Sequence, residues 1–174
     1  MKIIKKQINK GFSIIEVVIV CSVLSICVFA LMSSSAKSIQ VSHQALRQAQ
    51  ATLLVEEGVE AVKSIRDNSW TDISSLTINT DYYLFFNTST NLWSLRLSSS
   101  GTSAPSGSIP NYPIDSVFTR KIVVSPVYRD GNYNIASSGN LDAGTKKVTV
   151  TVSWNGQSSV VSKNLSFYIS NIFN

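Results

Sequence analysis

Lys10-Gly11-Phe12-Ser13-Ile14-Ile15-Glu16 opens the stretch of sequence that decides the fold, and an uncharged run over residues 17–36 follows it. Residues 12–32 are enough to cross the roughly 30 Å hydrocarbon core of a bilayer as an α-helix. Lysines gather before this segment, so the positive-inside rule predicts a cytoplasmic N-terminus and export of everything after Met32. These lysines are Lys2, Lys5, Lys6 and Lys10.

Glu16 is a carboxylate inside this apolar segment. A charge near the middle of a bilayer costs about 2.5–3.5 kcal/mol on insertion scales, so an intramembrane glutamate indicates a function and a partner.

Gly11, Phe12 and Glu16, in this order and spacing, resemble the N-terminal signature of type IV pilins and pseudopilins. The resemblance implies that a prepilin peptidase cleaves between Gly11 and Phe12 and methylates the new N-terminus. It also implies that Glu16 pairs with the freed amine of Phe12 on a neighbouring subunit and sets axial register in a filament. An α-amine has an unperturbed pKa of roughly 7.7–8.0, so it can be cationic at neutral pH and neutralise Glu16.

Two other interpretations of the N-terminus remain open. An ordinary secretory signal would use Ser34-Ser35-Ala36 as its cleavage site, but the apolar run exceeds the usual length of roughly 7–15 residues and contains Glu16. A plain single-span anchor would leave Glu16 without a role.

The basic character of the chain belongs largely to its leader. The net charge is +5, from fifteen basic and ten acidic residues, and removal of the four leader lysines leaves eleven against ten. Cys21 and Cys27 both lie in the span, so the exported part has no cysteine and must be held together by core packing.

Residues 33–67 continue the helical pattern, with no proline and with Gly58 as their one glycine. Ile39, Leu46 and Leu53 gather on one face together with Ala49, and we expect this face to pack against other stalks in a filament. A second apolar face is expected to lie on the subunit's own sheet; its residues are Leu54, Gly58, Ala61 and Ile65, with Val62 beside them.

Residues 53–67 are also similar to the stalk end of many small bacterial prepilin-like proteins, which favours a minor subunit. Pilins often have a proline about twenty residues beyond the cut, and here that place is Ser33.

The C-terminal half has the composition of a β-rich domain. Val148, Val150, Val152 and Trp154 alternate with polar residues, which is typical of a half-buried strand. Asn155-Gly156 then predicts a type I′ hairpin and a returning strand over residues 161–169. Earlier strands are expected over residues 82–86, 92–97 and 117–124, the last ended by Pro126.

The predicted fold is α+β: a long N-terminal helix packed on a small antiparallel sheet of four or five strands. Its parts are a leader (1–11), a transmembrane and assembly helix (12–32), an amphipathic stalk helix (33–67) and a β-rich head (68–174). Residues 98–116 and 129–145 are expected to form long loops.

Candidate chemistry in the head is sparse. Asp130, Asn132 and Asn134 place side-chain oxygens at alternate positions, as some Ca²⁺ loops do, but an Asx-type turn explains them more simply. His43 is the one histidine, so no Cys/His metal cluster and no Ser-His-Asp set is expected. We predict neither enzyme activity nor a cofactor.

Basic residues of the predicted sheet could attract DNA beside Trp154 or Tyr128, although such residues are usually the solvated face of a sheet. They are Arg120, Lys121, Lys146 and Lys147.

These patterns lead to one expected function and two rivals. The expectation is a minor subunit of a type IV pilus-like filament, held in the cytoplasmic membrane as a single-pass precursor and then moved into a cell-surface fibre. The implied partners are other pilins, a prepilin peptidase, an assembly platform with its ATPase and, before assembly, membrane lipid. The rivals are a type II secretion pseudopilin and an uncleaved membrane-anchored binding module.

Overall fold

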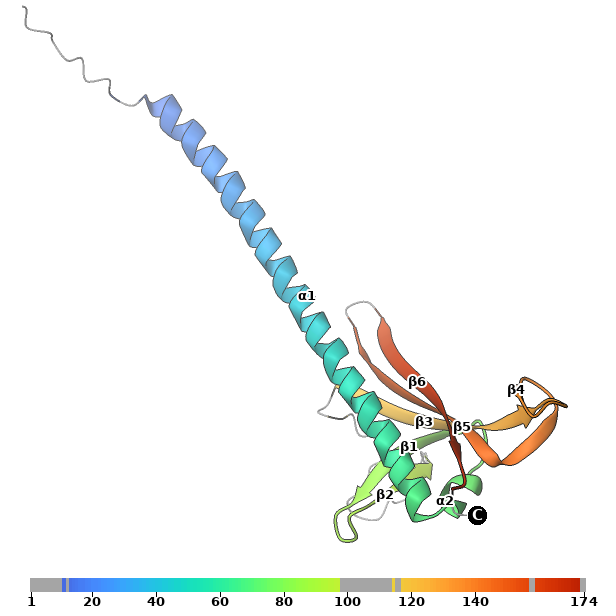
Figure 1. Cartoon of the computed structure of the whole chain (residues 1–174). Helices are drawn as coiled ribbons and strands as arrows, with labels where there is room; N and C mark the ends of the chain where they lie inside the picture. The colour runs from blue at the N-terminus through green and yellow to red at the C-terminus, as the bar shows by residue number, and fades with distance from the viewer. Residues whose placement is uncertain (1–10, 12, 98–113, 115–116, 157–158, 173–174) are drawn as a thin grey trace, which may run out of the picture. The chain divides into compact units, whose positions relative to one another are not determined.

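The computed structural model describes Gly11, residues 13–97, Ile114, and residues 117–156 and 159–172 (Figure 1). One long helix, α1 (Ile14–Asn68), packs on a six-stranded antiparallel sheet, which confirms the predicted α+β class. The chain divides into two compact units, Met1–Ala45 and Leu46–Asn174, and each is described separately below.

The first unit contains the N-terminal part of α1. The helix begins after Ser13, whose carbonyl oxygen accepts hydrogen bonds from the backbone N–H groups of Glu16 and Val17. A bilayer requires a spanning backbone to satisfy its own hydrogen bonds, and the helix does this from Ile14 onward. The hydroxyl of Ser33 donates to the carbonyl oxygen of Phe29 at 2.9 Å, and α1 continues unbroken through Ser33.

In the second unit, the C-terminal part of α1 supplies one wall of the core. Its buried residues are Ala51, Val55, Gly58, Val59, Ala61, Val62 and Ile65. This confirms the second apolar face predicted from the sequence, with Leu54 half-buried at its margin. A short helix, α2 (Thr71–Ser74), then places Ile73 completely within the same core.

The sheet has the order β2-β1-β3-β5-β6, and β4 pairs with β3 outside this path. Its strands are β1 (Asp81–Asn87), β2 (Leu92–Leu97), β3 (Phe118–Arg129), β4 (Ile135–Ala136), β5 (Asn140–Asn155) and β6 (Val160–Ser170). The sequence predicted four or five strands, and the strand it did not predict is the short β4.

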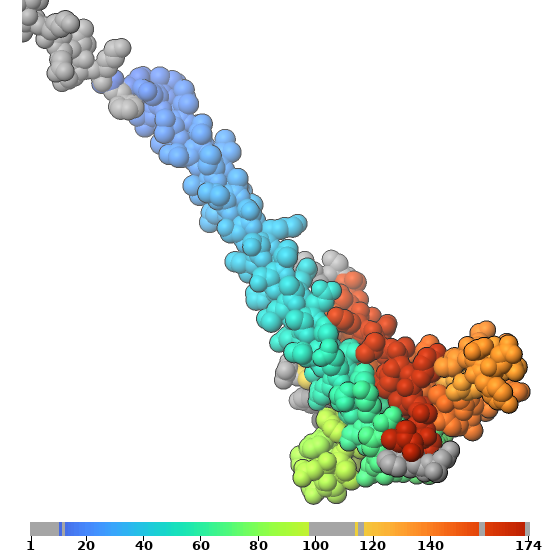
Figure 2. Space-filling model, in the orientation of Figure 1, coloured from blue at the N-terminus to red at the C-terminus, as the bar shows by residue number. Residues whose placement is uncertain are grey.

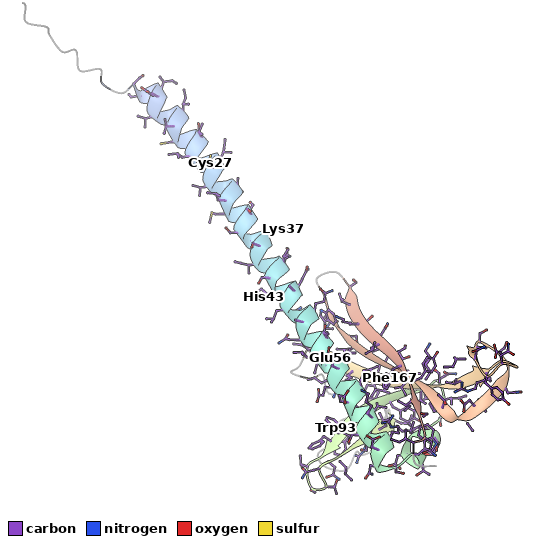
Figure 3. The ribbon with its side chains drawn as sticks, in the orientation of Figure 1. Cys27, Lys37, His43, Glu56, Trp93 and Phe167 are labelled. Atoms are coloured by element: carbon purple, nitrogen blue, oxygen red, sulfur yellow. The ribbon has the colours of Figure 1, made fainter. Side chains whose placement is uncertain are left out.

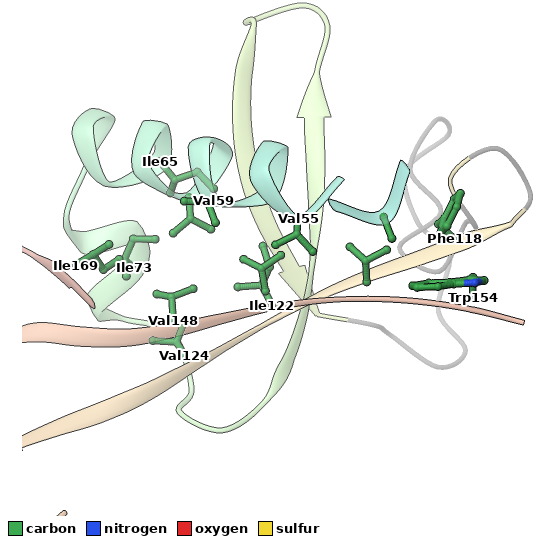
Figure 4. Packing of buried hydrophobic residues seen from close by; sticks show 14 residues of the cluster. Val55, Val59, Ile65, Ile73, Phe118, Ile122, Val124, Val148, Trp154 and Ile169 are labelled. Carbon is green, nitrogen blue, oxygen red and sulfur yellow. The ribbon is translucent and has the colours of Figure 1, made fainter. Parts of the chain in front are cut away.

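The core lies between α1 and one face of the sheet (Figure 4). Alternate residues of β3 and β5 are buried there, as the period of two along a strand dictates. They are Phe118, Arg120, Ile122 and Val124 of β3, and Val148, Val150, Val152 and Trp154 of β5. The rings of Phe118 and Trp154 meet edge to face with centroids 5.8 Å apart, an arrangement that aromatic pairs prefer.

The predicted end of β3 is wrong. The strand does not stop before Pro126 but continues to Arg129, because the pairing with β5 shifts register between Pro126 and Val127. A proline lacks the N–H that a regular ladder needs, and a bulge is a place where a strand tolerates it.

The type I′ turn at Asn155-Gly156 is also wrong. Asn155 pairs with Val160, and the N–H of Gly156 donates to the carbonyl oxygen of Ser159 at 2.9 Å. The connection therefore spans residues 156–159 and is longer than the two-residue loop of a type I′ hairpin.

The loop predicted over residues 129–145 is largely a ribbon of strands. The end of β3 pairs with the start of β5 on one side and with β4 on the other. We call residues 127–142 the β-arm, and Figure 1 shows it projecting beyond the rest of the sheet. Much of the arm is exposed, so no alternation of apolar and polar residues marked its strands. The other predicted loop, residues 98–116, falls outside the described residues except for Ile114.

Candidate functional site

The first candidate surface is the N-terminal part of α1. Every residue from 14 to 39 is exposed, including a series of large apolar side chains. These are Ile14, Ile15, Val17, Val18, Ile19, Val20, Val23, Leu24, Ile26, Val28, Phe29, Leu31 and Met32. An apolar surface of this extent needs lipid or other protein to cover it. The helix is long and apolar enough to cross a membrane, which makes it a candidate single-pass anchor.

Glu16 lies in the first turn of α1 and is exposed. Gly11, on the leader side of the expected cleavage, is exposed as well, whereas Phe12 lies outside the described residues. Ser13 directly precedes the helix, so Ser13 and Glu16 stand where a capping box has its serine and its glutamate. Helix capping is therefore one physical explanation for a glutamate at this position.

The stalk residues expected to face other subunits are uncovered. Ile39, Leu46 and Leu53 are 61%, 56% and 65% exposed, whereas Ala51 and Val55 are buried in the head. Residues spaced by seven lie on one side of a helix, so the three exposed side chains form an apolar stripe.

The cysteine and histidine side chains of α1 are exposed and lie at separate positions along the helix. Cys21 and Cys27 are exposed free thiols, and His43 is exposed further along the helix. Figure 3 shows Cys27, Lys37 and His43 at separate positions on α1.

The four basic residues considered for DNA binding do not form one patch. Arg120 is buried against α1, where Nη1 donates to Glu57 Oε2 at 2.8 Å and to the carbonyl oxygen of Leu54 at 3.0 Å. Lys121 instead pairs with Asp81 at 3.1 Å. Adjacent side chains of a strand point to opposite faces, and this separates Arg120 from Lys121. Trp154, one of the two aromatic residues considered beside them, is only 6% exposed.

The ion pair between Arg120 and Glu57 is a feature that sequence reasoning missed. It joins β3 to α1 across 63 residues of chain, so local patterns could not reveal the partner. One signal was available, because Arg120 occupies a core-facing position between Phe118 and Ile122 in the alternation of β3. A buried guanidinium needs a compensating charge or several acceptors.

The residues of the candidate Ca²⁺ loop come together in the turn of the β-arm. Asp130 Oδ1 accepts hydrogen bonds from the N–H groups of Asn132 and Asn134 at 2.8 and 2.9 Å, which is the pattern of an Asx-type turn. The N–H of Asn134, and secondly that of Asn132, hold the pKa of Asp130 below its ordinary value. Among the described residues, no group of three or more His, Cys, Asp or Glu side chains is suited to a metal ion.

A second carboxylate fastens the β-arm. Arg129 Nε donates to Asp142 Oδ2 at 2.7 Å, and Arg129 Nη1 donates to the carbonyl oxygen of Tyr133 at 2.8 Å. The hydrogen bond from Arg129 is the main cause that holds the pKa of Asp142 below its ordinary value of 3.8. Tyr133 has a φ of 63° and is 81% exposed, so the turn keeps this residue in the left-handed region.

The β-arm is expected to loosen in acid. A carboxylate whose pKa is lowered by folding contributes stability above its unfolded pKa, and this contribution is lost as the pH falls through the folded pKa. For Asp130 and Asp142 that window lies below pH 3.8. We expect the backbone amide resonances of Asn132 and Asn134 to move toward unfolded positions between about pH 4 and pH 2.

Asp142→Asn is the matched variant for this titration, and it should loosen the arm already at neutral pH. Amide resonances that stay constant down to about pH 2 contradict the stabilising role of the two carboxylates.

Comparison of the chain with protein-family models, with characterised proteins and with solved structures found no match.

Proposed function

We propose that this chain is a structural subunit, of the minor kind, of a type IV pilus-like surface filament, and that it has no enzymatic role. It is made as a precursor in the cytoplasmic membrane, cleaved between Gly11 and Phe12, and drawn into the fibre through α1. The N-terminal signature suggests the processing step, and the exposed surface of α1 supports the assembly step.

One observation carries the proposal: the exposed apolar side chains of α1 continue past the end of the expected span. A simple anchor needs apolar surface only where lipid covers it. Beyond Met32, however, Ile39, Leu46 and Leu53 repeat on one side of the helix and remain more than half exposed. An apolar stripe of this kind on a helix is suited to packing against other helices, as neighbouring stalks in a fibre would provide.

Localisation in native cells separates the proposal from its two rivals. We expect immunogold labelling of surface fibres, and recovery of the chain with sheared fibres. Confinement between the membranes favours a secretion pseudopilin instead. Retention of residues 1–11 on a chain that stays with the membrane favours an uncleaved anchored binding module.

Substitution within the exposed stripe tests the assembly surface. Leu46→Asp and Ile39→Asp should each reduce the amount of the chain in fibres by about ten-fold or more, because a charge there must be buried against an apolar neighbour. The thermal unfolding temperature of each full-length variant in detergent should stay close to that of the wild type, since both side chains are exposed.

Val55→Asp is the matched control on the same helix. Val55 is only 3% exposed, so its substitution should unfold the head itself. If Leu46→Asp destabilised the head as strongly as Val55→Asp, Leu46 would belong to the head and not to an assembly surface.

A further inference from the structure

A cavity of about 520 Å³ lies where the β-arm leaves the sheet. The register shift between Pro126 and Val127 marks this place, and bulges of this kind bend a strand and often lie beside functional sites. One wall is formed by Ile135, Ala136 and Ser137 of the arm. Figure 2 shows the arm (orange) standing out beyond β6 (red). We call this space the head cavity.

The floor of the head cavity is a cross-strand row on the face of the sheet away from α1. Lys147 of β5 stands between Ser125 of β3 and Tyr168 of β6, directly paired with both. Its neighbours along β5, Thr145 and Thr149, follow the period of two, and Thr149 also lines the cavity. Tyr128 adds a second aromatic ring to the lining.

Lys147 has no carboxylate partner among the described residues, whereas three other cations of the head have one. Arg120, Lys121 and Arg129 each lie within 3.1 Å of an acidic oxygen. Lys147 is half-buried, and a partly desolvated ammonium group favours an anion as its neighbour. The cavity thus presents a positive charge that the described fold does not neutralise.

We infer that the head cavity binds an acidic sugar, through a carboxylate that pairs with Lys147 and a ring that packs against Tyr168 and Tyr128. Binding pockets of about 300–1,000 Å³ with aromatic walls and a few polar groups are of the size and character that small ligands use. The lining also offers hydroxyl groups to a polyhydroxylated ring. Ser125 Oγ donates to Asn79 Oδ1 at 2.8 Å and can still accept a hydrogen bond, and Thr149 Oγ1 shares one hydrogen bond with Ser166 Oγ at 2.8 Å. The hydroxyl of Ser137 can donate or accept.

A single ammonium group can neutralise the one charge of a carboxylate, but not the roughly −1.5 to −2 charge of a phosphate group at neutral pH. Phosphate sites usually offer a bidentate arginine or a helix N-terminus, and no arginine lines the head cavity within the described part of the chain. The inference does not depend on filament assembly, since every lining residue belongs to the head.

Titration calorimetry on the full chain in detergent tests the site with three probes: glucuronic acid, glucose and inorganic phosphate. We expect glucuronic acid to bind about ten-fold more tightly than glucose, as one charge-assisted hydrogen bond provides, and more tightly than phosphate. Lys147→Gln should bring glucuronic acid to the affinity of glucose. Tyr168→Ala should weaken both sugars.

Lys146→Gln is the matched control, because Lys146 is adjacent in sequence and does not line the head cavity. It removes the same charge from the chain and should leave all three affinities unchanged. The inference is overturned if no probe binds, if glucose or phosphate binds as tightly as glucuronic acid, or if Lys146→Gln has the same effect as Lys147→Gln.

Discussion

The Glu16→Ala substitution is expected to reduce incorporation of the chain into filaments by about two orders of magnitude or more. Under the proposed function, Glu16 neutralises the free amine of Phe12 on a neighbouring subunit in an apolar environment. Removal of one partner of a buried ion pair costs roughly 3–5 kcal/mol, and about 1.4 kcal/mol corresponds to ten-fold. Quantitative immunoblotting of sheared fibres against total cell protein measures the loss.

Glu16→Gln decides between the two explanations of this residue. Glutamine can replace glutamate in a capping box, so a capping role predicts nearly normal incorporation. Glutamine carries no charge, so a neutralising role predicts a loss as large as that of Glu16→Ala. Normal incorporation of the Glu16→Gln chain would contradict the neutralising role, and Ser13→Ala then becomes the appropriate test of the cap.

The Gly58→Val substitution is expected to lower the free energy of unfolding of the head by about 3 kcal/mol, because it overpacks the core. A Cβ atom at Gly58 would lie 2.7 Å from Val150 Cγ1 and 3.2 Å from Arg120 Cδ. Val150 is completely buried and Arg120 is held by Glu57, so neither neighbour can move away at low cost. Denaturant unfolding followed by tryptophan fluorescence measures the change.

Two further substitutions separate crowding at Gly58 from the effects of helix propensity and of the valine side chain itself. Gly58→Ala improves helix propensity by about 1 kcal/mol. It would therefore stabilise the head if there were room for a Cβ atom at this position. We expect net destabilisation, because the crowding at 2.7 Å outweighs this gain. Ser64→Val places the same side chain at an exposed position of α1 and should change stability by only about 0.5 kcal/mol. Stabilisation by Gly58→Ala would show that α1 lies farther from β5 than described.

Elements that depend on a local pattern could be predicted from the sequence. The long helix follows from an unbroken apolar run without proline, and its second apolar face follows from the spacing of Gly58, Ala61 and Ile65. The strand around Val150 was visible because one face is buried and the other is polar, which produces a clear alternation.

Elements that depend on distant contacts could not be predicted. The β-arm is exposed on most of its surface, so its strands carry no burial signal. β3 passes Pro126 only because β5 accommodates a bulge there. The head cavity combines residues of four strands, β3, β4, β5 and β6. Lys147 resembles an ordinary solvated residue in the sequence, because only strand pairing places Ser125 and Tyr168 on either side of it.

The candidate assembly residues were all chosen from the sequence, and the structure places them in surroundings that suit the proposal. Ile39, Leu46 and Leu53 are exposed and Glu16 lies in the first turn of the helix. Under the proposed function, the partner for each of these surfaces is another molecule, so a single chain gives their exposure and not their contacts.

The intact mass and N-terminal fragment spectrum of the chain recovered from cells test the central claim most directly. The account predicts a chain that begins at N-methylated Phe12, without residues 1–11. A chain that begins at Met1 would contradict it and indicate a simple anchored domain. A chain that begins near Lys37 would also contradict it, and would indicate an ordinary secreted protein.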